Sequence, residues 1–537
     1  MHENDARARI GGMPVSDTGI QARVRDLSSA AQDHAVARRF DEAAACFEQA
    51  LALLPGDPDL LLQLSYMHSL AGHYRLAHRY ALEASGKQAQ RPEVVKELLA
   101  RLRTFNEIPA MSACIERLLP MSRISIPLLI NIAAQLTYAG QPEKAIAFLD
   151  EARRGDPEYP PTLLSRAHVL MFLGRFTEAG EDLARVLKRA PQLAQGYWLQ
   201  SQVRRQSASG NHIDPIIAQL QMPQRPEQDL ALLGFALHKE LDDLGRHDEA
   251  WQALQKGCAS KRSSLRYDAT HTKRMFEGLR RFAPRTAVTR NAEAVFPATP
   301  VFIVGMHRSG TTLLEQLLDG HSNVAGLGEL YDFTSAMRYA TDHHCAGVMD
   351  ARIPERAVDV DFGEVGKRYL DGVAWRLKGE EFFIDKLPSN FLNTGFICEA
   401  LPQAKVLHMV RDPMETCFSN LRELFSDANP YSYDQLELAD FFNEYRELMA
   451  HWHARYPGRI LDVDYARLTR DPEKEIRRVC DFIGTAFEPD MLQLQSRTRG
   501  IVTASAVQVR GHIEVRETPK WRAYEKHLQP LRQRLGG

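Results

Sequence analysis

A pattern of small and bulky residues recurs every 34 residues in the first half of the chain. The pattern is A-x3-F-x2-A-x4-P, and alanines or similar residues return to the same places at multiples of 34. A fixed period of this length is the signature of a helical repeat array. The four copies contain Ala43, Phe47, Ala50 and Pro55; Ala77, Ala81 and Ala84; Ala145, Leu149, Ala152 and Pro157; and Ala179, Leu183, Val186 and Pro191.

Helix pairing explains the choice of residues in this pattern. Small residues seven apart lie on one helix face and let a partner helix approach, while the bulky residue between them fills the remaining space. The proline ends the second helix of each pair. The pattern resembles the tetratricopeptide repeat over roughly residues 25–195, with a degenerate copy near Met111 and an out-of-register copy at 245–254. The resemblance implies a solenoid that binds a peptide or protein, and a spacer without a ligand stays the alternative.

A poorly periodic stretch separates this array from the rest of the chain. Residues 281–300 contain three prolines and read as a linker. We therefore expect a helical array at 25–280, a linker at 281–298 and a second domain at 299–537.

The second domain opens with VFIVGMHRSGTTLLEQLL at 301–318. A β-branched and aromatic run predicts a strand at 300–304, and helical periodicity follows at 312–321. The loop between them is bounded by Gly305 and Gly310, which is the context of a phosphate-binding loop. Main-chain N–H groups from Met306 to Thr312 can converge there on an anion at the positive end of the helix.

This loop lacks the lysine of a nucleoside triphosphatase. The pattern GxxxxGK[ST] would place lysine where the chain has Thr311, and Arg308 supplies the positive charge instead. An acidic residue that ends a second strand and could hold magnesium is not evident. The loop therefore favours a phosphoester that needs no metal.

The segment GMHRSGTT, followed by Glu329 in GLGE, resembles the 5′-phosphosulfate loop of sulfotransferases, with spacing closest to the protein-tyrosine sulfotransferases. The resemblance implies 3′-phosphoadenosine 5′-phosphosulfate as sulfuryl donor and a parallel α/β core related to nucleotide kinases. His307 departs from the proline more often found at its position. The residues implied to hold the 5′-phosphate are Arg308, Ser309, Gly310, Thr311 and Thr312.

Other segments are similar to further parts of the same family. By resemblance, Arg411 and Ser419 in AKVLHMVRDPMETCFSN hold the 3′-phosphate, although an Arg-Asp-Pro turn can also simply cap a helix. Lys386 in FFIDKLPSNF is implied to lie near the oxygen that bridges phosphate and sulfate. Tyr465 is implied to contact the nucleotide, with a half-buried core aromatic as the alternative. In the basic C-terminal stretch, Ser505 is implied to lie by the sulfuryl group and Lys520 to reach a nucleotide phosphate; a solvated surface is the alternative.

Sulfuryl transfer requires a base for the acceptor proton and positive charge on the sulfuryl oxygens and the leaving phosphate. Glu329 is the candidate base, and Lys386 and Ser505 are the candidates for stabilising the transferred group. A sulfotransferase whose array binds a protein, peptide or other hydroxyl acceptor is therefore the predicted function. A kinase that uses ATP and magnesium, or a non-catalytic scaffold, are the alternatives.

Composition limits partners and location. The formal net charge of −2 gives no field for nucleic acid. Seven scattered cysteines without a CxxC pair, and no signal peptide or apolar span, predict a cytoplasmic protein. No metal is expected, and the pair His343–His344 reads as a surface feature because no third ligand is spaced for a metal. A homodimer is compatible with both parts, and the acceptor stays open between tyrosine, glycan, lipid and small molecule.

Overall fold

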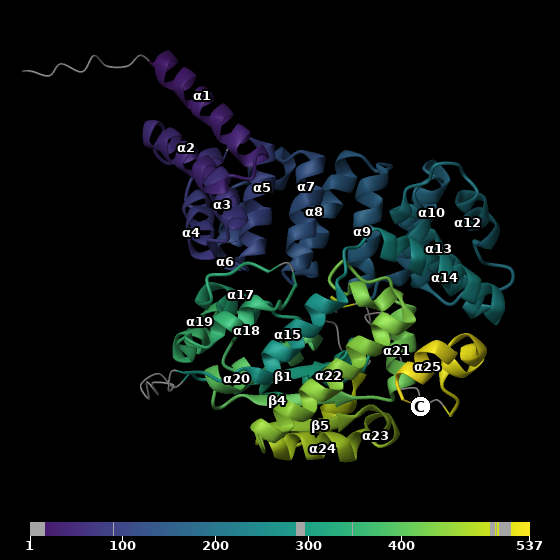
Figure 1. The fold of residues 1–537 in the computed structure, drawn as a ribbon. Helices are drawn as coiled ribbons and strands as arrows, with labels where there is room; N and C mark the ends of the chain where they lie inside the picture. Colours follow the sequence, from purple (N-terminus) through teal and green to yellow (C-terminus); the bar gives the residue numbers. More distant parts are fainter. Residues whose placement is uncertain are drawn as a thin grey trace, which may run out of the picture. The chain divides into compact units, whose positions relative to one another are not determined.

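Helices make up almost all of the chain before residue 282 (Figure 1). The computed structural model describes residues 17–89, 91–285, 296–345, 347–494, 500, 502–503 and 517–536. The chain divides into two units between Cys114 and Ile115. The first unit holds α1 (Asp17–Val36), α2 (Phe40–Leu53), α3 (Pro58–Ala71), α4 (Tyr74–Ser85) and α5 (Pro92–Thr104), and α6 (Ile108–Glu116) crosses the division. The helical part of the second unit comprises η1 (Met121–Arg123), α7 (Ile126–Tyr138), α8 (Pro142–Gly155), α9 (Pro160–Phe172), α10 (Phe176–Arg189), α11 (Ala194–Val203), α12 (Ile213–Leu220), α13 (Glu227–Asp243), α14 (His247–Ser263) and α15 (Ala269–Arg281).

The 34-residue period appears in the backbone as a left-handed turn between the two helices of each pair. A residue with positive φ recurs at intervals of 34, including the copy whose sequence is degenerate. Asparagine and glycine adopt this conformation most readily. The residues are Arg38 (φ 58°), Gly72 (90°), Asn106 (60°), Gly140 (71°) and Gly174 (75°). Gly245 (φ 72°) makes the same turn between α13 and α14, so the out-of-register copy is also a helix pair.

The alanines of the repeated pattern are buried as the helix-pairing argument predicts. Ala43, Ala77, Ala145 and Ala179 are all 0% exposed. The array is thus a set of helix pairs in close contact along their small residues.

The second half of the chain is built on a parallel sheet of five strands in the order β2-β3-β1-β4-β5. All pairings are parallel. The predicted strands are present as β1 (Thr299–Gly305), β3 (Phe382–Asp385), β4 (Lys405–Val410) and β5 (Ile460–Asp464). The three-residue β2 (Val324–Gly326) is too short to leave a periodic signal. The predicted fold class, a tetratricopeptide-like solenoid plus a parallel α/β domain, is confirmed.

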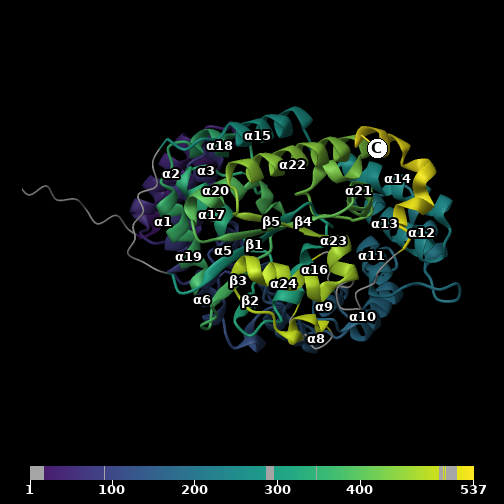
Figure 2. The same cartoon turned by 90° about the horizontal axis from the view of Figure 1, so that it is seen from below.

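Alternating side chains of β1 face two separate cores. Val301 and Ile303 pack with α16 and α24, whereas Phe302 and Val304 pack on the opposite face with α15, α20 and α22 (Figure 2). The remaining helices are α16 (Thr311–Leu318), α17 (Asp332–Ala340), α18 (Arg352–Ala357), α19 (Phe362–Ala374), η2 (Pro388–Leu392), α20 (Thr394–Ala400), α21 (Pro413–Leu421), η3 (Pro430–Tyr433), α22 (Gln435–Arg455), α23 (Tyr465–Arg470), α24 (Pro472–Ile483), η4 (Pro489–Leu492), η6 (Lys520–His527) and α25 (Gln529–Arg534).

The strand order locates the functional edge of the sheet. The chain builds β3 on one side of β1 and then crosses to place β4 on the other. In open parallel sheets, ligands bind outside the carboxyl ends of the strands at such a switch point. The loop after β1 lies at this position.

No helix within the described ranges combines the length and apolar composition of a membrane span. The helical array ends with α15 at Arg281 and β1 begins at Thr299. The predicted boundaries at 25–280, 281–298 and 299–537 stay predictions.

Candidate functional site

The loop from Met306 to Gly310 has a strained backbone held between β1 and α16. Arg308 (φ 64°) and Gly310 (φ 110°) both adopt positive φ, which is uncommon for a residue other than glycine. A Cβ on Gly310 would lie 2.4 Å from Cδ2 of Tyr465, so only glycine fits there. Thr311 and Thr312 begin α16, where main-chain N–H groups have no partner within the helix. The loop is therefore shaped to present N–H groups to an anion.

Ser309 adds an unsatisfied polar group to this loop. Its side chain is 1% exposed, and its Oγ has no hydrogen-bond partner among the residues that the structure describes. Buried polar atoms in native proteins are almost always paired. A ligand oxygen at the loop would satisfy this hydroxyl.

Arg411 and Ser419 meet Arg308 of the loop although the three come from separate segments. Arg411 follows β4 and donates from Nη1 to the main-chain oxygen of Arg308 at 3.1 Å. Arg308 donates from Nε to Ser419 Oγ at 3.3 Å. The helix-capping alternative also holds locally, because Asp412 accepts from the Glu415 main-chain N–H at the start of α21. Asp412 is therefore the capping residue, and the Arg411 side chain is directed at the loop.

Two carboxylates accompany these arginines. Glu415 Oε2 lies 2.7 Å from Arg411 Nη2, and Glu423 Oε2 lies 3.6 Å from Arg308 Nη1. Burial lowers the pKa of the Arg308 guanidinium; the Glu423 charge opposes this, and the Arg411 charge lowers the pKa further. Two guanidinium groups close together in a buried position favour the binding of an anion.

Tyr465 stands directly after β5 and contacts both parts of this site. Its ring centre lies 4.3 Å from Arg411 Cζ, and its ring edge faces Gly310. It also packs partly against the core that contains α16 and α24. Tyr465 therefore serves as a core aromatic and as a wall of the site.

Lys386 and Glu329 form a second polar group at the end of β3. Lys386 is 0% exposed, and its Nζ donates to Glu329 Oε1 at 2.8 Å. Glu315 Oε2 lies 3.9 Å from the same Nζ, while Glu315 Oε1 accepts from the Gly328 main-chain N–H at 2.8 Å. Glu329 keeps 31% of its side chain exposed. The lysine is thus fixed between a buried carboxylate and one that solvent or a substrate can reach.

His307 is enclosed by polar partners. Its Nε2 lies 3.3 Å from Ser389 Oγ and its Nδ1 3.5 Å from the Tyr431 hydroxyl. Asn420 donates to its main-chain oxygen at 2.7 Å. Burial lowers the pKa of His307 to about 4, and the charges of Lys386 and Arg308 lower it while that of Glu329 opposes. The imidazole is therefore neutral near pH 7.

Two statements drawn from the sequence are wrong. Asp385 does end a strand beside β1, where a magnesium-binding carboxylate would stand. Its carboxyl is fully buried and hydrogen-bonded by Tyr369 and Asn390, and burial raises its pKa well above the usual range. The pair His343–His344 is not a surface feature, because His343 is 7% exposed and lies 2.7 Å from Asp350.

The two predicted C-terminal residues stand apart from the rest. Ser505 lies outside the described residues. Lys520 is exposed at the start of η6, and its charge contributes to the lowered pKa of the Asp242 carboxyl on α13. The geometry therefore brings together the other predicted residues: Glu329, Lys386, Arg308, Ser309, Gly310, Thr311, Thr312, Arg411, Ser419 and Tyr465.

Sequence reasoning missed the acidic partners of these cations. Glu315 carried a signal, since it is a charged residue in the otherwise apolar face of TLLEQLL and is 2% exposed. Glu415 stands four residues after Arg411, a spacing that brings side chains together on a helix. Glu423 gave no sequence signal, because it meets Arg308 only in the folded chain.

The fold and the site together define a class of protein: a parallel α/β domain with a phosphate-type loop, preceded by a helical repeat array. Comparisons with known proteins identify the families that this class resembles. The sulfotransferase family model matches residues 300–489, and the tetratricopeptide repeat model matches residues 136–203. Residues 300–489 therefore form a sulfotransferase-family domain, and tetratricopeptide repeats precede it. The resemblance read from the sequence is confirmed.

Three curated relatives are similar to this chain. An uncharacterized protein of Aquifex aeolicus is 30% identical over 402 residues, 72% of this chain and 52% of that protein. The chain thus spans about half the length of this relative. Protein-tyrosine sulfotransferase 2 of Gallus gallus is 24% identical over 44% of this chain and 68% of its own length. Omega-hydroxy-beta-dihydromenaquinone-9 sulfotransferase of Mycobacterium bovis is 26% identical over 36% of this chain and 65% of its own length.

Proposed function

We propose that this protein transfers a sulfuryl group from 3′-phosphoadenosine 5′-phosphosulfate to a hydroxyl of a protein or peptide, with tyrosine as the acceptor side chain. The repeat array binds the acceptor protein or a partner that delivers it. The observation that carries the proposal is the meeting of Arg308, Arg411 and Ser419 beside a loop that offers main-chain N–H groups.

The residues present fit a donor with two phosphate positions. Ser309 Oγ is buried without a partner in the described part of the chain, and a Cβ at Gly310 would fill the space that the loop keeps open. Two arginines, one in the loop after β1 and one directly after β4, supply cations for two anionic groups. We assign the 5′-phosphate to Arg308, Ser309 and the first N–H groups of α16, and the 3′-phosphate to Arg411 and Ser419. Tyr465 borders the nucleotide.

The donor supplies an activated sulfuryl group, and the chain positions it and moves a proton. Glu329 accepts the proton of the acceptor hydroxyl, because its carboxylate is the one that a substrate can reach. Lys386 holds Glu329 in place and directs positive charge toward the leaving oxygen. Preorganised charge of this kind costs no reorganisation during the reaction. Ser505 as stabiliser of the sulfuryl group and Lys520 as phosphate contact are proposed from the family resemblance alone.

The kinase alternative has less support in the site. A kinase needs a carboxylate that holds magnesium near the loop. The best-placed carboxyl, Asp385, has a pKa raised by burial and is enclosed by Tyr369 and Asn390. It is poorly suited to bind a hydrated metal ion.

Calorimetry with 3′-phosphoadenosine 5′-phosphate in the absence of magnesium tests the donor assignment. We expect micromolar binding that is lost in Arg411→Ala and retained in Arg470→Ala, which removes an exposed arginine at the end of α23. ATP with magnesium serves as the competing ligand. Tight binding of ATP–magnesium without binding of the bisphosphate would replace this proposal with the kinase alternative. If neither ligand binds, the non-catalytic scaffold is favoured.

Acceptor class is tested separately with radiolabelled donor. Tyrosine-containing acidic peptides, a small phenol and a long-chain alcohol are compared in parallel. Labelling of the peptide above the other two supports a protein acceptor. Preferential labelling of the alcohol would move the proposal to a lipid hydroxyl and would leave the donor assignment intact.

A further inference from the structure

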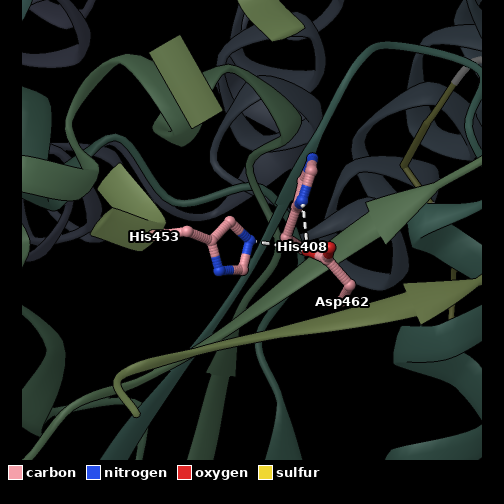
Figure 3. A group of neighbouring side chains, drawn as sticks. All are labelled: His408, His453 and Asp462. Atoms are coloured by element: carbon pink, nitrogen blue, oxygen red, sulfur yellow. Dashed lines mark hydrogen bonds and ion pairs between the residues drawn. The ribbon is translucent and has the colours of Figure 1, made fainter. Parts of the chain in front are cut away.

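Two histidines and an aspartate converge at neighbouring strands of the sheet (Figure 3). His408 lies on β4, and Asp462 is its direct partner on β5. His453 comes from the last turn of α22. His408 Nδ1 and His453 Nε2 each lie 2.7 Å from the same atom, Asp462 Oδ1. In the described ranges this is the one group of three such side chains with ligand atoms within 4.8 Å of one another.

The setting of His408 distinguishes the cluster from an ordinary surface ion pair. Its side chain is buried in the strand KVLHMV, where the other positions are apolar apart from Lys405. Its second ring nitrogen, Nε2, lies 2.5 Å from the hydroxyl of buried Tyr445. Histidines that bind metals almost always use their second nitrogen for a hydrogen bond that fixes the ring. The His343 ring pairs with Asp350, and among the residues that the structure describes no third ligand group joins them.

We propose that His408, His453 and Asp462 bind one divalent transition-metal ion, for which Zn²⁺ is the probe. Two imidazoles and one carboxylate are a ligand set that zinc accepts, with solvent in the fourth position. Magnesium and calcium prefer oxygen ligands and fit this set poorly. Ligand atoms around tetrahedral zinc lie about 3.3 Å apart, so each histidine nitrogen needs to move only about 0.6 Å away from Asp462 Oδ1. The two histidine nitrogens lie within 4.8 Å of each other. Asp462, 55% exposed, and His453, 35% exposed, leave the ion a path from solvent.

The ion would be linked to the phosphate loop through the Tyr445 hydroxyl. With Nδ1 on the metal, His408 carries its proton on Nε2 and donates it to the Tyr445 hydroxyl. The main-chain N–H of Met306, the first residue of the loop, lies close enough to the same hydroxyl to lower its pKa. The proposed ion therefore has a structural role that ties β4, β5 and α22 to the loop. It departs from the metal-free expectation drawn from the sequence, and it does not depend on the proposed donor.

Zinc binding is measured with chelator-treated protein, by competition with a chromophoric chelator. We expect uptake of one equivalent per chain and a rise in the midpoint of thermal unfolding. Loss of a hydrogen-bond partner of a metal ligand typically weakens binding ~10–100-fold, so Tyr445→Phe should fall in that range. His453→Gln and Asp462→Asn each remove a proposed ligand and should weaken zinc binding by more than this range. His451→Gln, two residues earlier on the same helix, should bind like the unaltered protein.

The seven cysteines are an alternative source of zinc ligands. The absorption spectrum of bound Co²⁺ distinguishes binding at the proposed site from binding to cysteine. Cobalt at the proposed site absorbs without a thiolate-to-metal charge-transfer band, whereas cobalt on cysteine shows that band. The proposal is overturned if the protein does not take up one equivalent of Zn²⁺, or if the first equivalent of Co²⁺ shows the thiolate band. It is also overturned if His453→Gln binds zinc as tightly as the unaltered protein. Circular dichroism of each metal-free variant checks folding; should His453→Gln fail to fold, Asp462→Asn and Tyr445→Phe carry the test.

Discussion

Lys386, which is completely buried, donates from Nζ to the carboxylate of Glu329 at 2.8 Å. The lysine has a second carboxylate partner in Glu315, whose Oε2 lies 3.9 Å away and whose side chain is only 3% exposed. Glu329, by contrast, keeps 31% of its side chain exposed. A lysine so fixed can orient Glu329 without moving itself. Glu329 is therefore the carboxylate suited to proton transfer, and the buried Glu315 is suited to a structural role.

Glu329→Gln should lower kcat ~10²–10⁴-fold, the range for loss of a general base. The amide keeps the shape of the side chain but cannot take the acceptor proton. Binding of the bisphosphate should change little. Turnover of a small phenol and calorimetry measure the two quantities.

Glu315→Gln is the matched control for that experiment. An amide oxygen can still accept from the Gly328 main-chain N–H, so this variant should lose far less activity. Equal losses in the two variants would mean that Glu329 acts only as a counter-charge for Lys386.

Gly310→Ala should impair the loop beyond its effect on stability. Gly310 has φ 110°, and its Cβ would lie 2.4 Å from Tyr465. Gly458 has φ 76°, and a Cβ added there would meet no atom within 4 Å, so Gly458→Ala isolates the backbone cost. That cost is about 1–2 kcal/mol for a left-handed residue.

Both glycine variants should shift the urea midpoint, but only Gly310→Ala should reduce turnover. A misplacement of about 1 Å can cost ~100-fold in rate. Unchanged turnover in Gly310→Ala would show that the loop accommodates the methyl group and that its contact with Tyr465 is unimportant.

How far the sequence predicts this molecule depends on whether a feature is local. The helix pairs were predictable because small residues recur on one face, yet the turns at Arg38 and Asn106 were hidden by residues other than glycine. The loop and Arg411 were predictable because strand, turn and spacing are local patterns. Glu423 was not, because its contact with Arg308 spans 115 positions and is set by packing.

A partly buried carboxylate should make stability depend on acid pH. Burial would raise the pKa of Asp242, but the Arg422 guanidinium at 2.7 Å and the Tyr524 hydroxyl at 2.6 Å outweigh it and hold the pKa at about 2. A depressed pKa stabilises the folded state above the unfolded pKa near 4, and the effect is lost as pH falls toward 2. The difference is worth about 2 kcal/mol.

Asp242→Asn should therefore lower the urea midpoint at pH 6, and the difference should shrink as pH falls and disappear only below about pH 2. Asp248→Asn is the control, since Asp248 pairs with Lys526 and His527 at the surface and such pairs contribute little. A difference that persists unchanged at low pH would assign the effect of Asp242 to packing rather than charge.

The repeat array contains a buried ion cluster whose disruption should be costly. Arg166 on α9 donates to Asp150 Oδ1 and to Asp182 Oδ2, each at 2.6 Å. Arg166 is 4% exposed and Asp182 is 2% exposed. Arg166→Ala leaves the buried Asp182 charge with only the more distant guanidinium of Arg153, at 3.9 Å. Breaking a buried pair costs about 3–5 kcal/mol.

An exposed pair in the same repeats supplies the comparison. Arg175 pairs with Glu178 at 2.6 Å, and loss of such a surface pair costs about 0–1 kcal/mol. Amide hydrogen exchange in α9 and α10 should therefore accelerate strongly in Arg166→Ala and little in Arg175→Ala. The double variant Arg166→Met with Asp182→Leu should recover protection, because apolar residues of similar volume can replace a buried pair without leaving a charge. Failure of the double variant to recover would mean that the cluster sets the geometry of the helix pair and does more than compensate its own charges.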